Sequence, residues 1–416
     1  MELIDLPYDC LSCIFDCFSN LKQLLDLSTV CKQWNILVKR RLKKIRHLHV
    51  EREHYLSYVP FSSDNHIYTD DVELMERVNV SQFLPNLKFL SLNPNLYGEC
   101  TGKMVVNILS TTANPLVGLM CETQCCSSDE IHSKCQVNVD EIVKHCGNLK
   151  YMEILDEPFL ESYFFKYKFG QSLKYFEGYI TEYDIIEKDE DYDYNFEEIN
   201  LLCRYLEQMP NLEVLSLNEP IIEPRLWPLP KMKLKEIRFL DIRSSSSVFQ
   251  FLPFFPHLRT IRLYIREVKG KDEGFPDSHT HQNVQDVVLK IHKYQGSPVE
   301  SLNLIKSIMV KFPNCKNLSI DILRRVFTIT NGDLIEIIKV LPNLTLFVLT
   351  VENWEDANII ETLDKFCKSA GRRINFILRS DGQTIGARSY TRYVLNEDDA
   401  SPLKIDYEFL QKCHVY

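Results

Sequence analysis

Short apolar phrases recur along most of the chain and predict a repeated structural unit. In the clearest copies, apolar residues occupy the first, fourth and sixth positions, as in Leu87, Leu90 and Leu92. The clear copies occupy residues 84–93, 146–155, 209–218, 255–265, 312–322 and 341–351. Because side chains of a strand alternate between its two faces, the fourth and sixth positions face one side together. Each phrase therefore predicts one short, half-buried strand.

Weaker copies and helical stretches fill the intervals between these phrases. The weaker copies lie at 45–50, 116–121, 173–176, 237–242, 284–289 and 374–378, and the helical stretches at 139–145, 196–208, 299–311 and 334–340. The LxxLxL spacing is similar to that of leucine-rich repeats. The resemblance implies an α/β solenoid over residues 49–380, a horseshoe with parallel strands on the concave face and helices outside. A C-terminal tail would occupy 381–416.

The repeats are irregular. The asparagine that often follows the strand phrase fits at Asn95, but Pro220 stands where another is expected. We expect the long intervals 51–83 and 177–198 to be loops.

Two apolar, helix-like stretches precede the repeats. The first, LPYDCLSCIFDCF, covers residues 6–18, and the second carries apolar residues at Leu24, Val30 and Leu37 with helical spacing. Together they are too short to bury both apolar stripes, so surplus apolar surface is expected. On the first helix Cys10, Cys13 and Cys17 share one face, which we interpret as small core side chains.

The order of these residues resembles the F-box motif over residues 3–48. LPYDCLSCIF followed by DLSTVCKQW corresponds to the family pattern, although Asp26 lies closer to Val30 than in many members. The family is a three-helix motif that docks on the Skp adaptor of cullin-RING ubiquitin ligases. The residues that the resemblance assigns to adaptor binding are Leu6, Pro7, Leu11, Ile14, Phe15, Leu25, Leu27, Val30, Cys31 and Trp34.

The resemblance implies a substrate-recognition subunit of an SCF (Skp–cullin–F-box) E3 ubiquitin ligase, partnered through the adaptor by cullin and RING subunits. One alternative is a leucine-rich-repeat scaffold that acts outside any ligase, with the first helices capping the solenoid. Another is a ligand-gated receptor of the plant hormone kind, which needs a pocket that no sequence pattern reveals.

The net charge limits the classes of partner that the chain is expected to bind, and the cysteines bear on its cellular compartment. The 416 residues carry a formal charge of −10, which disfavours broad binding to nucleic acid or anionic lipid. The basic run at 38–47 is interpreted as the solvated face of a helix. The amino-terminal sequence lacks a signal-peptide pattern, so the 14 cysteines are expected to be reduced thiols in a cytoplasmic and/or nuclear protein. No apolar run has the length of a membrane span.

No catalytic motif is recognised. The sequence has only 13 glycines and no phosphate loop, nucleophile elbow or zinc-protease helix, so we expect a non-enzymatic protein without a cofactor. Cys121, Cys125, Cys126, His132 and Cys135 supply enough ligands for zinc, but without paired CxxC spacing, and we expect no metal. The acidic tract at 181–198 lacks the order of a calcium loop and is expected to be solvated.

The strand phrases also predict a substrate-binding patch. Residues at the fifth and seventh positions should point out onto the concave face. Across three consecutive coils these outward positions give a basic patch with an aromatic centre, suited to an acidic or phosphorylated degron. Its residues are Arg243, Arg262, Tyr264, Arg266, Lys290 and His292.

Overall fold

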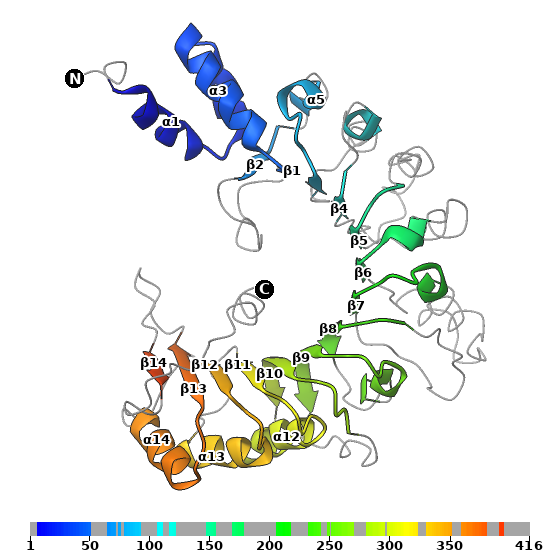
Figure 1. The fold of residues 1–416 in the computed structure, drawn as a ribbon, viewed down its shortest axis with the longest axis vertical. Coiled ribbons are helices and arrows are strands. Elements are labelled where there is room, and N and C mark those ends of the chain that lie inside the picture. Colours follow the sequence, from blue (N-terminus) through cyan, green and yellow to red (C-terminus); the bar gives the residue numbers. More distant parts are fainter. Residues whose placement is uncertain are drawn as a thin grey trace. The chain divides into compact units, whose positions relative to one another are not determined.

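The computed structural model describes residues 6–50, 65–71, 74–75, 79–92, 106–110, 116–121, 147–154, 169–178, 205–217, 232–242, 248–249, 251–269, 280–295, 298–322, 330–351, 359–380 and 391–394. The chain divides into two compact units (Figure 1). Unit 1 comprises Met1–Ile180 with Arg204–Leu212, and unit 2 comprises Thr181–Cys203 with Glu213–Tyr416.

Unit 1 begins with three helices and continues as a parallel sheet. The helices are α1 (Tyr8–Asp16), α2 (Leu21–Ser28) and α3 (Lys32–Lys44). The strands are β1 (His47–Val50), β2 (His66–Thr69), β3 (Phe89–Leu92), β4 (Gly118–Cys121), β5 (Tyr151–Ile154) and β6 (Tyr175–Gly178), with the short helices α5 (Val80–Phe83) and η5 (Phe169–Ser172). Parallel pairing gives the order β2-β1-β3-β4-β5-β6.

Unit 2 continues the same pattern with more helix. Its strands are β7 (Val214–Leu217), β8 (Glu236–Ile242), β9 (Thr260–Lys269), β10 (Asp286–Gln295), β11 (Asn317–Ile322), β12 (Leu346–Val351), β13 (Asn375–Ser380) and β14 (Thr391–Val394). Its helices are η7 (Leu252–Phe254), α12 (Pro298–Val310), α13 (Asn331–Val340) and α14 (Ile359–Ser369). Strands β7 to β13 pair in parallel in chain order, and β14 pairs antiparallel to β13.

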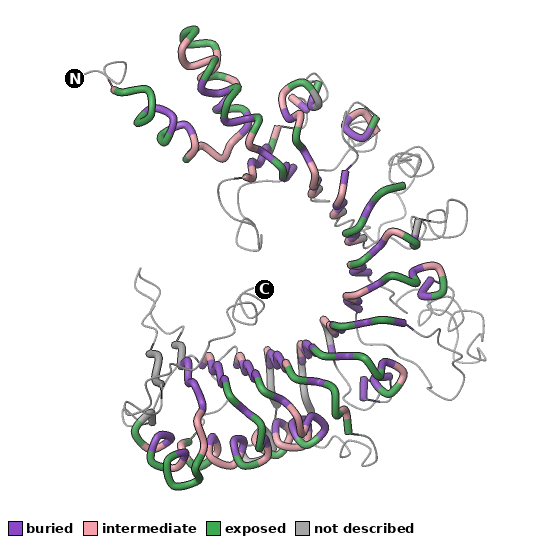
Figure 2. The backbone as a smooth tube through the Cα atoms, in the orientation of Figure 1, coloured by how far each residue is buried: buried purple, intermediate pink, exposed green. Residues whose placement is uncertain are grey.

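The core of each unit follows from the strand phrase. The fourth position of successive copies pairs across the sheet, as Leu90 does with Leu119 and Ile261 with Val287, and these side chains are fully buried. Helices α12, α13 and α14 follow one another beside the strands of unit 2 (Figure 1), and their apolar faces are buried as well (Figure 2). Each unit is therefore an α/β repeat solenoid of the leucine-rich-repeat type.

A repeated backbone contact fixes the register of the coils. The carbonyl of the residue before a strand accepts hydrogen bonds from two successive amides of the next coil. Thus Arg46 O accepts Lys88 N at 2.8 Å and Phe89 N at 2.9 Å, and the same arrangement recurs at Lys150 O. Because a one-residue slip would break both bonds, each strand begins at a defined position.

A row of asparagines connects the coils, and the sequence analysis missed it. Each lies directly before the first apolar position and donates through its side-chain amide to a carbonyl of the preceding coil or helix. The donor–acceptor pairs are Asn86 to Lys43, Asn211 to Gln171, Asn283 to Pro256, Asn314 to Gln282 and Asn343 to Pro313. The Pro-Asn pairs within the phrases are the signal that would have revealed it.

Replacing Asn314 with alanine is expected to lower the free energy of unfolding of unit 2 by about 1–2 kcal/mol, because it removes bonds that join two coils. Asn314 Nδ2 lies 2.9 Å from the Gln282 carbonyl, and its Oδ1 accepts from Asn343 at 3.0 Å. Asn303, which is exposed on α12, is the matched control, and its alanine variant should unfold like the wild type in urea. Equal midpoints for both variants would contradict the role assigned to the asparagine row.

The structure confirms the expected strands and corrects one expected loop. Every strong and weak phrase contains a strand, and α12 and α13 match the helices expected at 299–311 and 334–340. Residues 51–83 are not all loop, because they include β2 and α5. Strand β2 covers the edge of β1 that would otherwise offer unpaired backbone groups. Strand β14 lies within 381–416, where only a tail was expected. The expected helix at 139–145 and the Asn95 and Pro220 positions lie outside the described residues.

Candidate functional site

The three amino-terminal helices pack around a small apolar interior. Leu11 and Phe15 of α1 are 0% and 2% exposed. The ring of Phe15 meets Trp34 of α3 edge to face, with centroids 5.4 Å apart. Among the residues that the sequence assigned to adaptor binding, Leu11 and Phe15 are therefore interior, whereas Trp34 is half-buried.

The opposite face of α1 is exposed and carries three thiols and one large apolar side chain. Cys10, Cys13, Ile14 and Cys17 lie on it at helical spacing, and all are exposed. The interpretation of the three cysteines as core side chains is wrong, because Leu11 and Phe15 turn the other face of the helix inward. Two faces of one short helix are thus apolar, which an isolated three-helix unit does not need for folding.

Two further apolar side chains are exposed, one at the turn between α2 and α3 and one within α3. Val30 is 60% exposed and Ile36 is 58% exposed. The thiol of Cys31 begins α3 by accepting the amide of Trp34 at 3.5 Å, which fixes the turn that presents Val30. Ile36 was missed from sequence because it lies beyond the motif residues.

Exposed apolar side chains concentrate in this segment. Six large apolar residues are exposed among those that the structure describes, and four of them, Tyr8, Ile14, Val30 and Ile36, belong to the amino-terminal helices. Of the remaining predicted adaptor residues, Pro7 and Cys31 are exposed, and Leu6, Leu25 and Leu27 are half-buried. The helices therefore present surface suited to apolar docking.

The helices are joined firmly to the first coil. Arg41 of α3 is 1% exposed and donates to the carbonyl of Phe18 at 3.4 Å and to that of His66 at 3.2 Å. The amide of Tyr68 in β2 donates to the carbonyl of Ser19 at 2.8 Å. Since Phe18 and Ser19 connect α1 to α2, these bonds tie the helical unit to the sheet.

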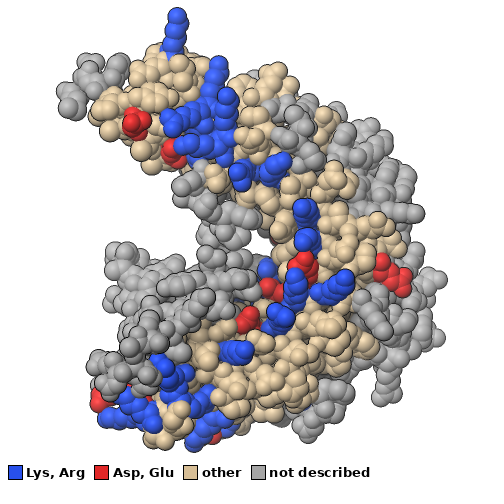
Figure 3. Space-filling model, in the orientation of Figure 1, with Lys and Arg blue, Asp and Glu red and all other residues tan. Residues whose placement is uncertain are grey.

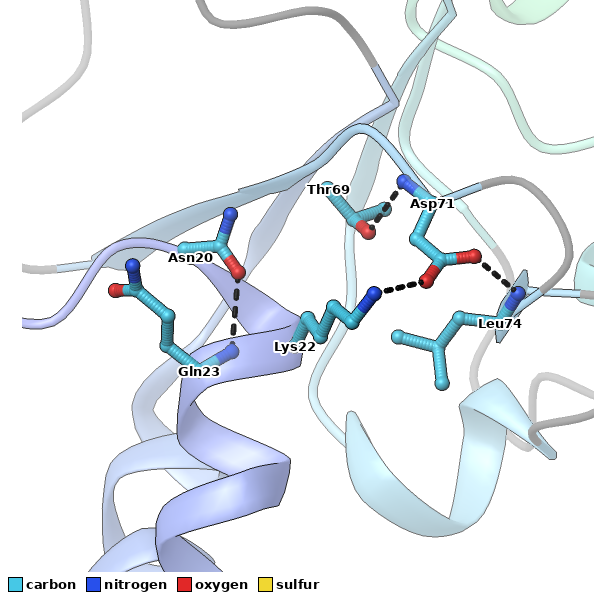
Figure 4. Close-up of polar contacts among 6 residues, drawn as sticks. All are labelled: Asn20, Lys22, Gln23, Thr69, Asp71 and Leu74. Carbon is cyan, nitrogen blue, oxygen red and sulfur yellow. Dashed lines mark hydrogen bonds and ion pairs between the residues drawn. The ribbon is translucent and has the colours of Figure 1, made fainter.

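Polar contacts at the surface extend the same junction (Figure 4). Lys22 of α2 forms an ion pair with Asp71 at 3.0 Å, and this carboxylate raises the pKa of the lysine. Asp71 also accepts the amide of Leu74 at 2.8 Å, which orders the turn after β2. Asn20 begins α2 by accepting the amide of Gln23 at 3.0 Å. The helices and β2 consequently hold one another in place.

Comparison with known protein families shows which family the three amino-terminal helices resemble. Residues 3–47 match the F-box-like family. This segment is an F-box-like domain. An F-box-like domain implies an adaptor protein as a partner, and the match ends where β1 begins the first coil.

Two solved structures are weakly similar to the whole chain. The structure of a Rad7 and Elc1 complex in yeast is 14% identical, covers 84% of each chain and has a TM-score of 0.36. The structure of a TLR13–ssRNA13 complex is 12% identical, covers 77% of this chain and has a TM-score of 0.30; the chain spans half the length of that protein. A search of curated proteins found no match.

Two buried histidines lie where the F-box-like domain meets the sheet. His47 and His49 of β1 are 6% and 5% exposed. Burial, with a smaller contribution from nearby histidines, lowers the pKa of each from 6.5 to about 4. Both side chains are therefore neutral at physiological pH.

Acidification is expected to destabilise unit 1 because of these histidines. The unfolded chain binds a proton at each near pH 6.5, whereas the folded chain does so only near pH 4, so stability falls as pH drops through that window. Between pH 7.5 and 5.5 the loss should be about 2 kcal/mol, measured by urea unfolding. A His47→Gln, His49→Gln variant should lose most of this pH dependence, and a His257→Gln control at an exposed site should keep it. Unchanged pH dependence in the double variant would contradict the assignment.

Five of the six residues predicted to bind substrate lie on β9 and β10 of unit 2, and two of them, Arg262 and Lys290, already contact carboxylates. Arg262 is 7% exposed, and its Nε lies 2.8 Å from Glu236 Oε1, which also accepts from Arg238 at 2.7 Å. Lys290, also 7% exposed, lies 4.0 Å from Asp321. The described charges in this region are thus balanced by neighbouring strands.

The structure describes only some of the other residues of the predicted substrate-binding patch. Tyr264 and His292 lie side by side, with ring centroids 6.3 Å apart. Only the backbone of Arg266 is described, and Arg243 lies outside the described residues. The substrate-binding assignment stays a prediction.

The described residues were also searched for metal sites and membrane-spanning helices. Within the described ranges, no group of three or more His, Cys, Asp or Glu side chains is arranged to hold a metal ion. The cysteine-rich stretch at 121–135 lies outside them apart from the backbone of Cys121. No described helix is long and apolar enough to span a bilayer.

Proposed function

We propose that the chain is the substrate-recognition subunit of an SCF E3 ubiquitin ligase, binding the Skp adaptor through the F-box-like domain and recruiting protein substrates through the repeats. The observation that carries the proposal is the exposed apolar surface of that domain. Ile14, Val30 and Ile36 are each more than a third exposed on a unit whose interior is already filled. Burial by a partner would stabilise a complex through the apolar area removed from water.

The rigid junction supports the same role. A receptor must hold its substrate at a defined place relative to the adaptor, and Arg41 with the backbone bond from Tyr68 to Ser19 fixes the first coil against the helices. The chain itself would do no bond chemistry, and its cullin and RING partners would be reached through the adaptor. We place this activity in the cytoplasm and/or the nucleus.

A repeat scaffold outside any ligase is the second candidate. In its favour, β2 covers the edge of β1, and Asn20 before α2 bridges to Tyr68 of β2. Covering the end of the sheet in this way is the role of a solenoid cap. A cap, however, needs no exposed apolar face.

Reconstitution separates the two candidates. The full chain is co-expressed with the Skp adaptor, and the mixture is passed over a gel-filtration column before cullin, RING subunit, ubiquitin and its activating enzymes are added. The ligase proposal predicts a stoichiometric chain–adaptor complex that assembles with the cullin and supports ubiquitin transfer. A chain that elutes alone, with the adaptor in a separate peak, would favour the scaffold.

A further inference from the structure

A basic residue immediately precedes four of the six strands of unit 1. These residues are Arg46, Lys88, Lys150 and Lys174, before β1, β3, β5 and β6, and we call them the edge row. Strands β2 and β4 depart from the pattern, with Asn65 and Val117 at this position. Arg46, Lys150 and Lys174 are exposed, and Lys88 is partly so. In Figure 3, lysine and arginine side chains recur on the visible face of the molecule.

The edge row is held at fixed spacing by the backbone. The carbonyls of Arg46, Lys88 and Lys150 each accept two amides of the next coil. Because neighbouring strands lie about 4.8 Å apart, the cationic side chains project from a pre-ordered row that is interrupted at β4. A ligand therefore meets several charges without ordering the backbone that carries them.

Three members of the edge row carry a positive charge that no described carboxylate balances, in contrast to the arginines of unit 2. The side chains of Arg46, Lys88 and Lys150 form no ion pair with any residue that the structure describes, whereas Arg262 lies against Glu236. In a protein with a formal charge of −10, such a row attracts anionic partners.

A row of rings lies directly beside the edge row. The first residues of these strands are His47, Phe89, Gly118, Tyr151 and Tyr175. Ring centroids are 4.3 Å apart between His47 and Phe89, 5.6 Å between Phe89 and Tyr151, and 6.3 Å between Tyr151 and Tyr175. A Cβ at Gly118 would lie 2.3 Å from the Phe89 ring, so glycine allows the rings on either side of β4 to meet. Tyr151 is 41% exposed and offers an apolar contact.

We infer that unit 1 binds an acidic linear segment of a protein partner, with its carboxylates or phosphates on the edge row and its apolar side chains on the rings. The inference rests on the proposed function only in taking that partner to be the substrate. Lysine and arginine bind both kinds of acidic group, and the rings favour a peptide that also carries apolar residues.

The third residues of β5 and β6 favour a peptide over a nucleic acid. They are Glu153 and Glu177, and the latter accepts a hydrogen bond from the Tyr175 hydroxyl. The rings are thus bordered by cations on one side and carboxylates on the other. A nucleic acid that stacked bases on the rings would bring its phosphates close to these carboxylates.

Fluorescence anisotropy with the full chain in complex with the adaptor tests the inference. The probe is a labelled peptide of about twelve residues that alternates glutamate and phenylalanine, a length that spans the strands of unit 1 when extended. Matched probes carry phosphoserine or lysine in place of glutamate, and a labelled oligothymidine represents nucleic acid. We expect the glutamate or the phosphoserine peptide to bind, more weakly at high salt, and the lysine peptide not to bind.

Charge reversal locates the site. A Lys88→Glu, Lys150→Glu variant should bind the acidic peptide about tenfold more weakly, because two attractive contacts become repulsive. An Arg259→Glu, Lys316→Glu variant is the matched control. These residues also precede strands and are exposed, but Thr260 and Asn317 follow them in place of rings. The control should bind like the wild type.

Several outcomes would overturn the inference. They are no binding of either acidic peptide by the wild type, equal losses in the two charge-reversal variants, or tighter binding of oligothymidine than of the peptides. Adaptor co-elution of each variant is measured in parallel. Failure of the wild-type chain to bind the adaptor would count against the proposed function. The same peptide measurement on the isolated chain would still show whether the edge row binds acidic peptides.

Discussion

Replacing Val30 with aspartate is expected to weaken adaptor binding by about 100-fold, because a charge would be placed in an apolar interface. Val30 is 60% exposed in the turn before α3, so the substitution should leave folding nearly unchanged. Ile14→Asp on the outward face of α1 should weaken binding to a similar degree. Isothermal titration of the Skp adaptor into each purified variant measures both effects.

Val310 supplies the matched control. It is 52% exposed at the end of α12, in the other unit, and Val310→Asp should bind the adaptor like the wild type. Thermal unfolding of all three variants verifies that they remain folded. Wild-type affinity in both Val30→Asp and Ile14→Asp would show that the adaptor, if it binds, uses another surface.

Replacing Arg41 with alanine is expected to lower the free energy of unfolding of unit 1 by about 3 kcal/mol. The side chain is 1% exposed, and its loss would leave the carbonyls of Phe18 and His66 without this donor and open a cavity between helix and sheet. Urea unfolding followed by tryptophan fluorescence measures the change, since Trp34 reports on the helices.

The neighbouring Arg40 is the control for Arg41. It is exposed, and its guanidinium lies 5.9 Å from the centre of the Tyr8 ring at the surface. Arg40→Ala should cost well under 1 kcal/mol. If the two alanine variants unfold at the same urea concentration, Arg41 does not hold the junction together.

The strands could be predicted because the same few positions determine each of them. Apolar residues at the fourth position, such as Leu90 and Ile261, are buried whatever the intervals between coils contain. The copy at 237–242 was predicted in the wrong register, because Ile237 pairs with Leu215 and takes the fourth position, while Leu240 is only half-buried. The phrase at 45–50 correctly predicted that β1 would follow α3 directly. Strand β2 could not be predicted, because residues 66–69 lack the phrase that marks the other strands, although they pair in parallel with β1.

The adaptor-binding surface and the substrate-binding patch were harder to predict than the strands, and particular side chains explain why. The outward face of α1 could not be separated from its inward face, because cysteine suits both a core and a surface that a partner will cover. The charge on Arg262 was expected to be available because the preceding copy was taken to begin at Ile237, which left Glu236 outside it. Glu236, at the start of the preceding strand, reaches that guanidinium diagonally across the sheet.

The most direct test of the central claim is the rate at which individual thiols react with iodoacetamide, with and without the Skp adaptor, measured by mass spectrometry. Cys10, Cys13 and Cys17 are exposed on the proposed interface, so the adaptor should slow their reaction about tenfold or more. Cys367 is buried, and burial raises its pKa to about 11, so it should react slowly in both samples and serve as the internal reference. Protection of the α1 thiols is the predicted result. A stable adaptor complex in which Cys10, Cys13 and Cys17 react as fast as in the free chain would contradict it.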